Sequence, residues 1–371
     1  MNRIICTALL SMAVMTSFAD SLTDSLRAIF DERYADALVG EAPGGSVLIT
    51  KGDSVIFEYY AGLADMVSKK PIGPETTFCI ASVSKQFTVA GLMRLAEKGL
   101  VDMDAPLTRW FAYKAPFWAN VTPRHLASQS SGIPDTRDRS DWNKMIFADD
   151  AYSVTYFPSV KKTQFTPGTA YDYVNPTFIL LANIIEKVTG RPFIDYQRNE
   201  IFNPAGMNST YYFDPENTPA VQSHGYAPND RGGWDEYDYG EETFFATRPD
   251  GGIYSNVRDM ARWEKALADH KILNANSLSE VYTPRVDVSS SPWCDYQRRP
   301  HTAYAMGWFV DDTPGRPVKV YHTGDNGGYQ AYVAKYPDLN LRIIVLENRH
   351  DRDRWSMAQT LDKLLLPHFP H

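Results

Sequence analysis

The segment Ser82-Val83-Ser84-Lys85 places a hydroxyl group and an amine three residues apart. If a helix begins at Ser82, Lys85 lies one turn later on the same face, within reach of the Ser82 hydroxyl. A serine hydroxyl becomes a strong nucleophile when a neighbouring group takes its proton, and a desolvated lysine can do this. Backbone N–H groups at such a helix start also point toward an oxyanion that develops beside the serine. The alternative is that Ser82 only caps the N-terminus of an amphipathic helix.

The Ser-x-x-Lys pattern is weak evidence by itself, because a chain of this composition should contain about one match by chance. A second match, Ser159-Val-Lys-Lys162, is present. Context separates the two. Ser82 opens a helical pattern of apolar residues that runs to Lys98, and Gly99 follows where a left-handed C-cap belongs. Ser159 follows Pro158 in a stretch without periodicity, so Ser82 is the candidate nucleophile.

Tyr173 and Asn175 lie in a predicted turn at the start of an apolar helix that covers residues 178–188. A tyrosine can exchange protons when an ammonium group is near, and an asparagine can hold a substrate amide. The ordinary alternatives are a core tyrosine and a capping asparagine. We therefore treat both residues as candidates that depend on their neighbours in the fold.

His322, Thr323 and Gly324 follow a predicted strand over residues 318–321. Glycine permits a close backbone approach at this point, and the next N–H group, on Asp325, could complete an oxyanion hole. A strand-end histidine alone is more often structural than functional. The three short motifs together, in this order and in these contexts, predict a catalytic site.

Several other site signatures are absent from the chain. It contains no Gly-x-Ser-x-Gly, His-Glu-x-x-His, Cys-x-x-Cys or Gly-x-x-x-x-Gly-Lys pattern, and its eight His are scattered. The acidic residues 235–238 are interpreted as a surface loop rather than as a cation site. We therefore expect no metal ion and no cofactor.

The composition describes an ordinary soluble globular protein. The chain has 371 residues, 43% of them hydrophobic, and a formal charge of −8 without any basic block, which argues against a nucleic-acid partner. Aromatic residues reach 13%, and several lie in the loop Tyr226–Thr247. That loop is either the wall of a cleft or a surface loop packed on itself.

The hydrophobic pattern predicts how the elements are ordered. A helix over 22–38 and a hairpin of strands 45–50 and 54–60 come first, and short helices (178–188, 257–268) with long loops follow. Strand patterns return near the C-terminus, before a last helix over 355–366; they cover residues 303–310, 318–322, 330–336 and 341–346. This order predicts an α/β (α+β) fold, in which one antiparallel sheet is built from both chain ends and flanked by terminal helices.

The same order predicts a mainly helical subdomain inserted into the sheet subdomain. We place the sheet subdomain at about 20–80 and 300–371 and the helical subdomain at about 82–299, which together form a single domain over 20–371. No internal repeat or low-complexity linker separates them.

Residues 1–19 have the pattern of a cleaved secretory signal, with Arg3, an apolar stretch from Ile4 to about Met15, and the small-residue end Ser17-Phe18-Ala19. The alternative, a membrane anchor, needs about 18 or more apolar residues. We expect a periplasmic or secreted protein without a membrane span after cleavage. Cys79 and Cys294 would remain, and their spacing leaves open whether they form a disulfide.

Six ordered blocks resemble the serine β-lactamase and penicillin-binding-protein superfamily. The nearest branch contains class C β-lactamases, D,D-carboxypeptidases of the His-Thr-Gly type, D-aminopeptidases and related esterases. The blocks span nearly the whole chain after residue 19: Phe78–Thr88, Leu126–Pro134, Phe165–Gly168, Tyr173–Asn175, Gly251–Asn256 and His322–Gly324. The resemblance implies the sheet-plus-helical-insertion fold, with the site in the groove between the two parts.

The resemblance also implies roles for the candidate residues. Ser82 would be the acylated nucleophile, Lys85 its proton acceptor, and Tyr173 the group that passes protons to the leaving group and the hydrolytic water. Asn175 would orient the substrate amide. His322, Thr323 and Gly324 would line the substrate site from the opposite strand, and the N–H groups of Ser82 and Asp325 would form the oxyanion hole. Gly251 and Gly252 would serve backbone geometry rather than chemistry.

One departure from the family pattern bears on the substrate. The third motif begins with His322 where β-lactamases usually have lysine, and histidine is mostly neutral above about pH 6.5. This favours a peptidase, amidase or esterase over a β-lactamase. Asp325 could either hold His322 protonated or repel an anionic substrate, and the sequence leaves both open.

The leading hypothesis is an exported serine hydrolase that forms an acyl-enzyme on Ser82. Its substrates would be amides or esters, namely D-amino-acid peptides or small esters, with peptidoglycan stem peptides and β-lactams as further candidates. The alternatives are a β-lactamase or an acyltransferase of the same fold and, in another class, a non-hydrolytic sensor or scaffold. Intact Ser82, Lys85 and Tyr173 argue against the last.

Overall fold

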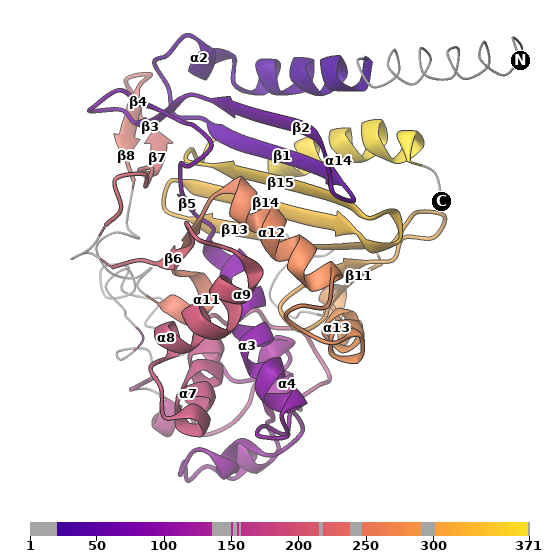
Figure 1. Cartoon of the computed structure of the whole chain (residues 1–371). Coiled ribbons are helices and arrows are strands. Elements are labelled where there is room, and N and C mark those ends of the chain that lie inside the picture. Colours follow the sequence, from indigo (N-terminus) through magenta and orange to yellow (C-terminus); the bar gives the residue numbers. More distant parts are fainter. Residues whose placement is uncertain are drawn as a thin grey trace, which may run out of the picture.

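The computed structural model in Figure 1 describes residues 21–135, 150, 154–155, 157–214, 218–237, 247–290 and 301–369. Within these residues an eight-stranded antiparallel sheet has the order β10-β11-β12-β13-β14-β15-β1-β2. Its strands are β1 (Gly45–Lys51), β2 (Ser54–Ala61), β10 (Val286–Asp287), β11 (Thr302–Tyr304), β12 (Phe309–Asp311), β13 (Lys319–Asn326), β14 (Tyr329–Tyr336) and β15 (Leu341–Glu347).

Strands from the two ends of the chain pair with each other inside this sheet. Strand β1 pairs with β15 in a register that runs from Gly45 opposite Glu347 to Lys51 opposite Leu341. The hairpin of β1 and β2 lies on one side of this junction, and the C-terminal strands lie on the other. The prediction of one antiparallel sheet assembled from both chain ends is confirmed.

Both faces of the central strands are covered, and every residue of β14 and β15 is buried. Alternate residues of β15 therefore enter different cores. Ile343 and Val345 pack with the terminal helices, which comprise residues 21–33 and α14 (Arg354–Leu365), whereas Ile344 and Leu346 pack with the helical part. Figure 1 shows this layering, with α12 (Val257–Ala268) crossing the sheet on the side of the helical part.

The helical part holds the remaining helices and several short strands. The helices are α3 (Lys85–Glu97), α4 (Pro123–Ala127), α7 (Thr177–Thr189), α8 (Phe193–Gln197), α9 (Asn203–Ala205), α11 (Arg248–Gly251) and α13 (Ala275–Tyr282). The short strands are β5 (Phe78–Cys79), β6 (Tyr211–Tyr212) and β9 (Ile253–Ser255), which form a small sheet of their own. Helix α3 packs on α7, which brings the predicted nucleophile helix beside the helix that follows Tyr173.

Three element predictions need correction. The strand pattern over 303–310 is two short strands, β11 and β12, because Gly307 has φ +80 and lets the chain turn between them. Strand β13 does not end at residue 321 but continues to Asn326, so the His-Thr-Gly motif lies inside a strand. The N-terminal helix is interrupted at Tyr34, and α2 (Ala35–Leu38) is a separate short helix.

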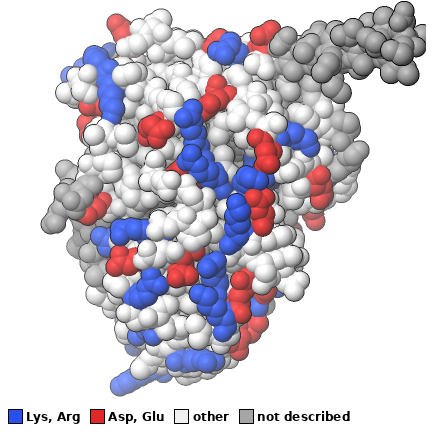
Figure 2. All heavy atoms as spheres, in the orientation of Figure 1, with Lys and Arg blue, Asp and Glu red and all other residues white. Residues whose placement is uncertain are grey.

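Helix α12 belongs to the sheet by its contacts, since it packs on β1 and β15. Two ion pairs tie its solvent-facing side to the first hairpin: Arg258 to Glu58 and Lys265 to Asp53, both at 2.7 Å. Figure 2 shows cationic and anionic side chains interleaved over this face of the molecule. Because these pairs are largely exposed, each contributes little stability, and burial of apolar side chains holds α12 in place.

The second half of β13 lies directly against the turn that precedes α3. Pairing with β12 stops at Tyr321 opposite Phe309, and the following residues of β13 contact the short 3₁₀ helix Ala81–Ser84. A Cβ atom added to Gly324 would lie 2.2 Å from the carbonyl oxygen of Ile80 and 3.1 Å from Cβ of Ala81. Only glycine therefore allows this approach.

We expect Gly324→Ala to push β13 away from this turn, because the obstacle is backbone that cannot rotate aside. The unfolding free energy should fall by about 1 to 3 kcal/mol, measured by urea denaturation, and catalytic activity should fall with it. Gly251→Ala is the matched control, since its Cβ would lie 3.9 Å from the carbonyl carbon of Ala81, an ordinary contact. Equal stability of the two variants would contradict this account of the packing.

Candidate active site

Ser82 lies in the 3₁₀ helix Ala81–Ser84, which leads directly into α3. The preceding residue, Ala81, has φ +45, so the chain leaves β5 through a left-handed residue that is unusual for alanine. This turn leaves Ser82 partly exposed while its neighbours are buried. The structure does not use Ser82 as a cap: its hydroxyl oxygen accepts a hydrogen bond from Nζ of Lys85 at 3.0 Å.

Lys85 is fully buried beside the serine. Its Nζ also donates to the backbone carbonyl of Asp250 at 2.8 Å, and it lies 4.9 Å from the ring centre of Tyr173 and 5.4 Å from that of Phe178. The carbonyl and the two rings therefore fix the amine where it can exchange a proton with the Ser82 hydroxyl. Asp250 acts through its backbone, which carries no sequence signal, and the sequence analysis missed it.

Tyr173 and Asn175 lie in the turn before α7, as predicted. The Tyr173 ring faces Lys85 on one side, and its centre lies 6.3 Å from that of His322. The side-chain oxygen of Asn175 is buried and accepts no hydrogen bond from any residue that the structure describes. An unpaired buried acceptor is costly, so this oxygen is suited to receive an N–H group from a bound molecule.

His322 is buried, with 1% of its surface exposed, and both ring nitrogens make hydrogen bonds within the protein. Nδ1 lies 2.7 Å from the carbonyl oxygen of Thr323, which can only accept, so Nδ1 carries a proton. Nε2 lies 3.0 Å from the hydroxyl of Tyr304. Burial raises the pKa of Tyr304 well above its usual value, so that hydroxyl keeps a proton that it can donate to Nε2. This pattern fits a neutral imidazole.

The Asp325 carboxylate does not face His322. Side chains alternate along a strand, and the register places His322 opposite Val333 in the core of the helical part, whereas Thr323 lies opposite Tyr332 in the other core. Asp325 shares the face of Thr323. Its carboxylate pairs with Arg354 at the start of α14, and Oδ1 lies 3.8 Å from Nε2 of His350.

Arg354 thus neutralises Asp325 and also donates to the carbonyl oxygen of Gly324 at 2.9 Å. The sequence left two roles open for Asp325: keeping His322 protonated and repelling an anionic substrate. The ion pair with Arg354 supports neither role, because the Asp325 carboxylate is directed away from His322 and its charge is neutralised. Arg354 and Tyr304 were missed by the sequence analysis, because only the folded sheet brings the start of the last helix and strand β11 to the His-Thr-Gly motif.

Other sequence candidates lie elsewhere or outside the described residues. Ser159 and Lys162 are exposed, so the second Ser-x-x-Lys match lacks a buried amine. In the aromatic loop, Trp234 stacks on the Arg349 guanidinium at 4.5 Å, and residues 238–246 fall outside the description. Cys294 also falls outside it. At Gly251 there is room for a Cβ atom, so neither its space nor its φ requires a glycine at this position.

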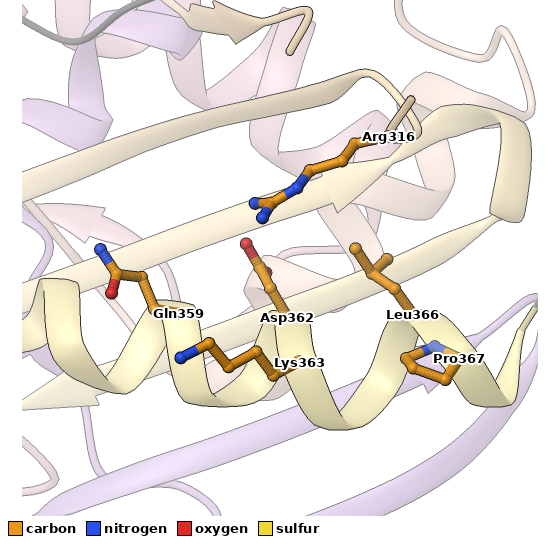
Figure 3. A pocket seen from close by; sticks show the side chains of 6 residues that line it. All are labelled: Arg316, Gln359, Asp362, Lys363, Leu366 and Pro367. Carbon is orange, nitrogen blue, oxygen red and sulfur yellow. The ribbon is translucent and has the colours of Figure 1, made fainter. Parts of the chain in front are cut away.

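No group of three or more His, Cys, Asp or Glu side chains that could hold a metal ion occurs in the part of the chain described here. A hollow beside α14 is lined by other residues (Figure 3), and its Asp362 is already bound to Lys319 at 2.7 Å and to the Tyr336 hydroxyl. It contains no activated nucleophile. Among the described helices, none is long and apolar enough to cross a membrane.

Known proteins with similar sequences include a penicillin-binding protein and D-aminopeptidases. Penicillin-binding protein 4* of Bacillus subtilis (strain 168) is 28% identical over 85% of this chain and 70% of its own length. A D-aminopeptidase of Brucella anthropi is 32% identical over 61% of this chain, and one of Cereibacter sphaeroides is 28% identical over 91%. The chain spans only 43% and 63% of those two D-aminopeptidases.

Solved structures show the same fold. A penicillin-binding protein from Bacillus halodurans matches 92% of this chain and 99% of its own, with a TM-score of 0.75 and 26% identity. A D-amino acid amidase from Ochrobactrum anthropi SV3, complexed with L-phenylalanine amide, matches 93% and 97%, with a TM-score of 0.74 and 25% identity.

The family model for beta-lactamases matches residues 27–365, which include every candidate site residue discussed above. The expected resemblance is confirmed, and this chain belongs to the beta-lactamase family, a family of serine hydrolases.

Proposed function

We propose that the protein hydrolyses amide bonds of D-amino-acid amides and short D-peptides through an acyl-enzyme on Ser82. The observation that carries the proposal is the buried Lys85 amine at 3.0 Å from the Ser82 hydroxyl. An apolar side chain of similar volume could fill the same buried position. Burying an amine costs free energy, and a scaffold without activity would have no use for that amine. The names of the D-aminopeptidase and D-amino acid amidase relatives support the substrate class.

The reaction begins with Ser82 Oγ attacking the substrate carbonyl carbon while its proton moves to neutral Lys85. The developing oxyanion accepts hydrogen bonds from the N–H groups of Ser82 and Asp325. The C–N bond then breaks, the leaving amine takes a proton passed through Tyr173, and an ester on Ser82 remains. Water attacks this ester, its proton returns through Tyr173, and the acid product leaves as Ser82 regains its hydroxyl proton. Asn175 holds the substrate N–H.

The charges near β13 favour substrates without a carboxylate beside the scissile bond. The hydrogen bonds of His322 fit a neutral imidazole, and the positive charge of Arg354 is matched by Asp325. Neither residue therefore offers an unneutralised cation to a C-terminal carboxylate. This argues for amides and esters of D-amino acids over D,D-carboxypeptide and β-lactam substrates, which carry that carboxylate.

The nucleophile assignment predicts how an active-site probe behaves. A fluorophosphonate should label the wild-type protein but not Ser82→Ala, and Lys85→Met should slow labelling by roughly three orders of magnitude because the proton acceptor is lost. Ser159→Ala is the control, since it removes the serine of the exposed second motif, and it should be labelled at the wild-type rate. Normal labelling of Ser82→Ala would refute the assignment.

The neutral environment of β13 predicts a substrate order. D-Phenylalanine amide and a D-alanine anilide should be cleaved with a higher kcat/KM than a peptide ending in D-Ala-D-Ala or nitrocefin. Amidation of the C-terminus of that same peptide should raise its kcat/KM, because it removes only the carboxylate. A preference for the free carboxylate in this matched pair would show that the site offers a cation after all.

We also propose that the protein is exported, on the basis of the signal pattern in residues 1–19. Cleavage after Ala19 would leave Asp20 at the N-terminus. Expression of the full chain in a bacterial host, followed by cell fractionation and N-terminal sequencing, checks this directly. A chain that keeps Met1 and remains in the cytoplasm would contradict it.

A further inference from the structure

The loop that carries Tyr173 and Asn175 is fastened along the segment after α4. Three backbone N–H groups of the loop donate to three carbonyl oxygens of this segment: Gln164 to Gly132 at 2.7 Å, Gly168 to Ser130 at 2.8 Å and Asp172 to Gln129 at 2.9 Å. The last of these bonds lies next to Tyr173. The position of the tyrosine ring is therefore set by the segment 129–132 rather than by α7 alone.

Gln129 holds this loop with its side chain as well. Its Oε1 accepts a hydrogen bond from the backbone N–H of Val174 at 2.8 Å, while its own carbonyl accepts from Asp172. One residue thus binds the backbone N–H groups of both sequence neighbours of Tyr173. Because the backbone is held one residue before and one residue after Tyr173, these two hydrogen bonds restrict the direction of its Cα–Cβ bond.

The conformation of Gln129 fits this role. It has φ +55, a left-handed conformation uncommon for glutamine, and only 1% of its surface is exposed. Its Nε2 is buried and makes no hydrogen bond to the residues that the structure describes. A strained backbone and an unsatisfied buried donor both cost free energy, so stability alone does not account for a glutamine here.

The consequence reaches the catalytic amine. Nζ of Lys85 lies 4.9 Å from the centre of the Tyr173 ring, so a shift of the loop by about 1 Å would separate the tyrosine from the lysine and from the acyl group. We propose that Gln129 is a positioning residue, which holds Tyr173 for proton transfer by binding the backbone on both sides of it. This inference rests on the role of Tyr173 in the proposed function.

A double-mutant cycle between Gln129 and Tyr173 tests the proposal. The variants are Gln129→Met, which keeps the volume but removes the acceptor, Tyr173→Phe, and the combination. Gln164→Met is the matched control: it changes the same residue type in the same loop, where Nε2 of Gln164 bonds the Asp172 carboxylate at the surface. All proteins are assayed for kcat and KM on D-phenylalanine amide and for thermal unfolding.

We expect Gln129→Met to lower kcat by about 10- to 100-fold with little change in KM, because substrate binding is kept while proton transfer is misaligned. In the Tyr173→Phe background the same substitution should change kcat by less than about twofold. Gln164→Met should leave kcat within about twofold of wild type. If Gln129→Met only destabilised the fold, it would lower kcat by a similar factor in wild type and in Tyr173→Phe. A much smaller effect in Tyr173→Phe therefore shows that Gln129 acts through Tyr173.

Two outcomes would overturn the proposal in distinguishable ways. If Tyr173→Phe retains wild-type kcat, the proton-transfer role in the proposed function fails, and the inference fails with it. If Tyr173→Phe is impaired but Gln129→Met costs the same factor in both backgrounds, only the inference fails.

Gln129→Glu keeps the test decisive if Gln129→Met does not fold. Burial keeps the new carboxyl group neutral, and its oxygen can still accept from Val174. We expect this variant to keep kcat within about threefold of wild type, and a loss as large as that of Tyr173→Phe would also refute the proposal.

Discussion

The site depends on how closely strand β13 lies against the turn that carries Ser82. Gly324 lies against the backbone of Ile80 and the Cβ atom of Ala81, and a single added methyl group would meet the carbonyl oxygen of Ile80 at 2.2 Å. The N-terminal part of the chain supplies the nucleophile and the C-terminal sheet supplies the strand. Strand β1 pairs with β15 within the same sheet, so assembly of the sheet from both chain ends brings these two parts of the chain together.

Charge in the site is arranged by pairing. The Asp325 carboxylate forms an ion pair with Arg354, and the His322 ring is bonded to the Thr323 carbonyl and the Tyr304 hydroxyl. The Lys85 amine contacts the Ser82 hydroxyl. A lysine at the position of His322 would carry a permanent charge to the same place. The substrate preference that we propose follows from this difference, since the family fold itself supports several reactions.

The sequence predicted one antiparallel sheet built from both chain ends and the short motifs, because periodicity and turn residues report local structure. It also predicted that Ser82 and Lys85 meet, since three residues of helix place them together. Tyr304, Arg354 and the Asp250 carbonyl stayed hidden, because each joins the site through strand register or backbone atoms. The length of β13 was underestimated because a glycine such as Gly324 usually indicates the end of a strand. Here Gly324 instead allows β13 to continue past the backbone of Ile80.

The central claim is a covalent acyl group on Ser82. The most direct measurement is to mix the protein with an ester of D-phenylalanine, quench in acid within the first turnovers, and map the peptides by mass spectrometry, with Tyr173→Phe included to slow deacylation. The account predicts one added D-phenylalanyl mass on the peptide that contains Ser82, accumulating further in Tyr173→Phe. Turnover of the ester without any covalent adduct in either protein, or an adduct on another residue, would contradict it.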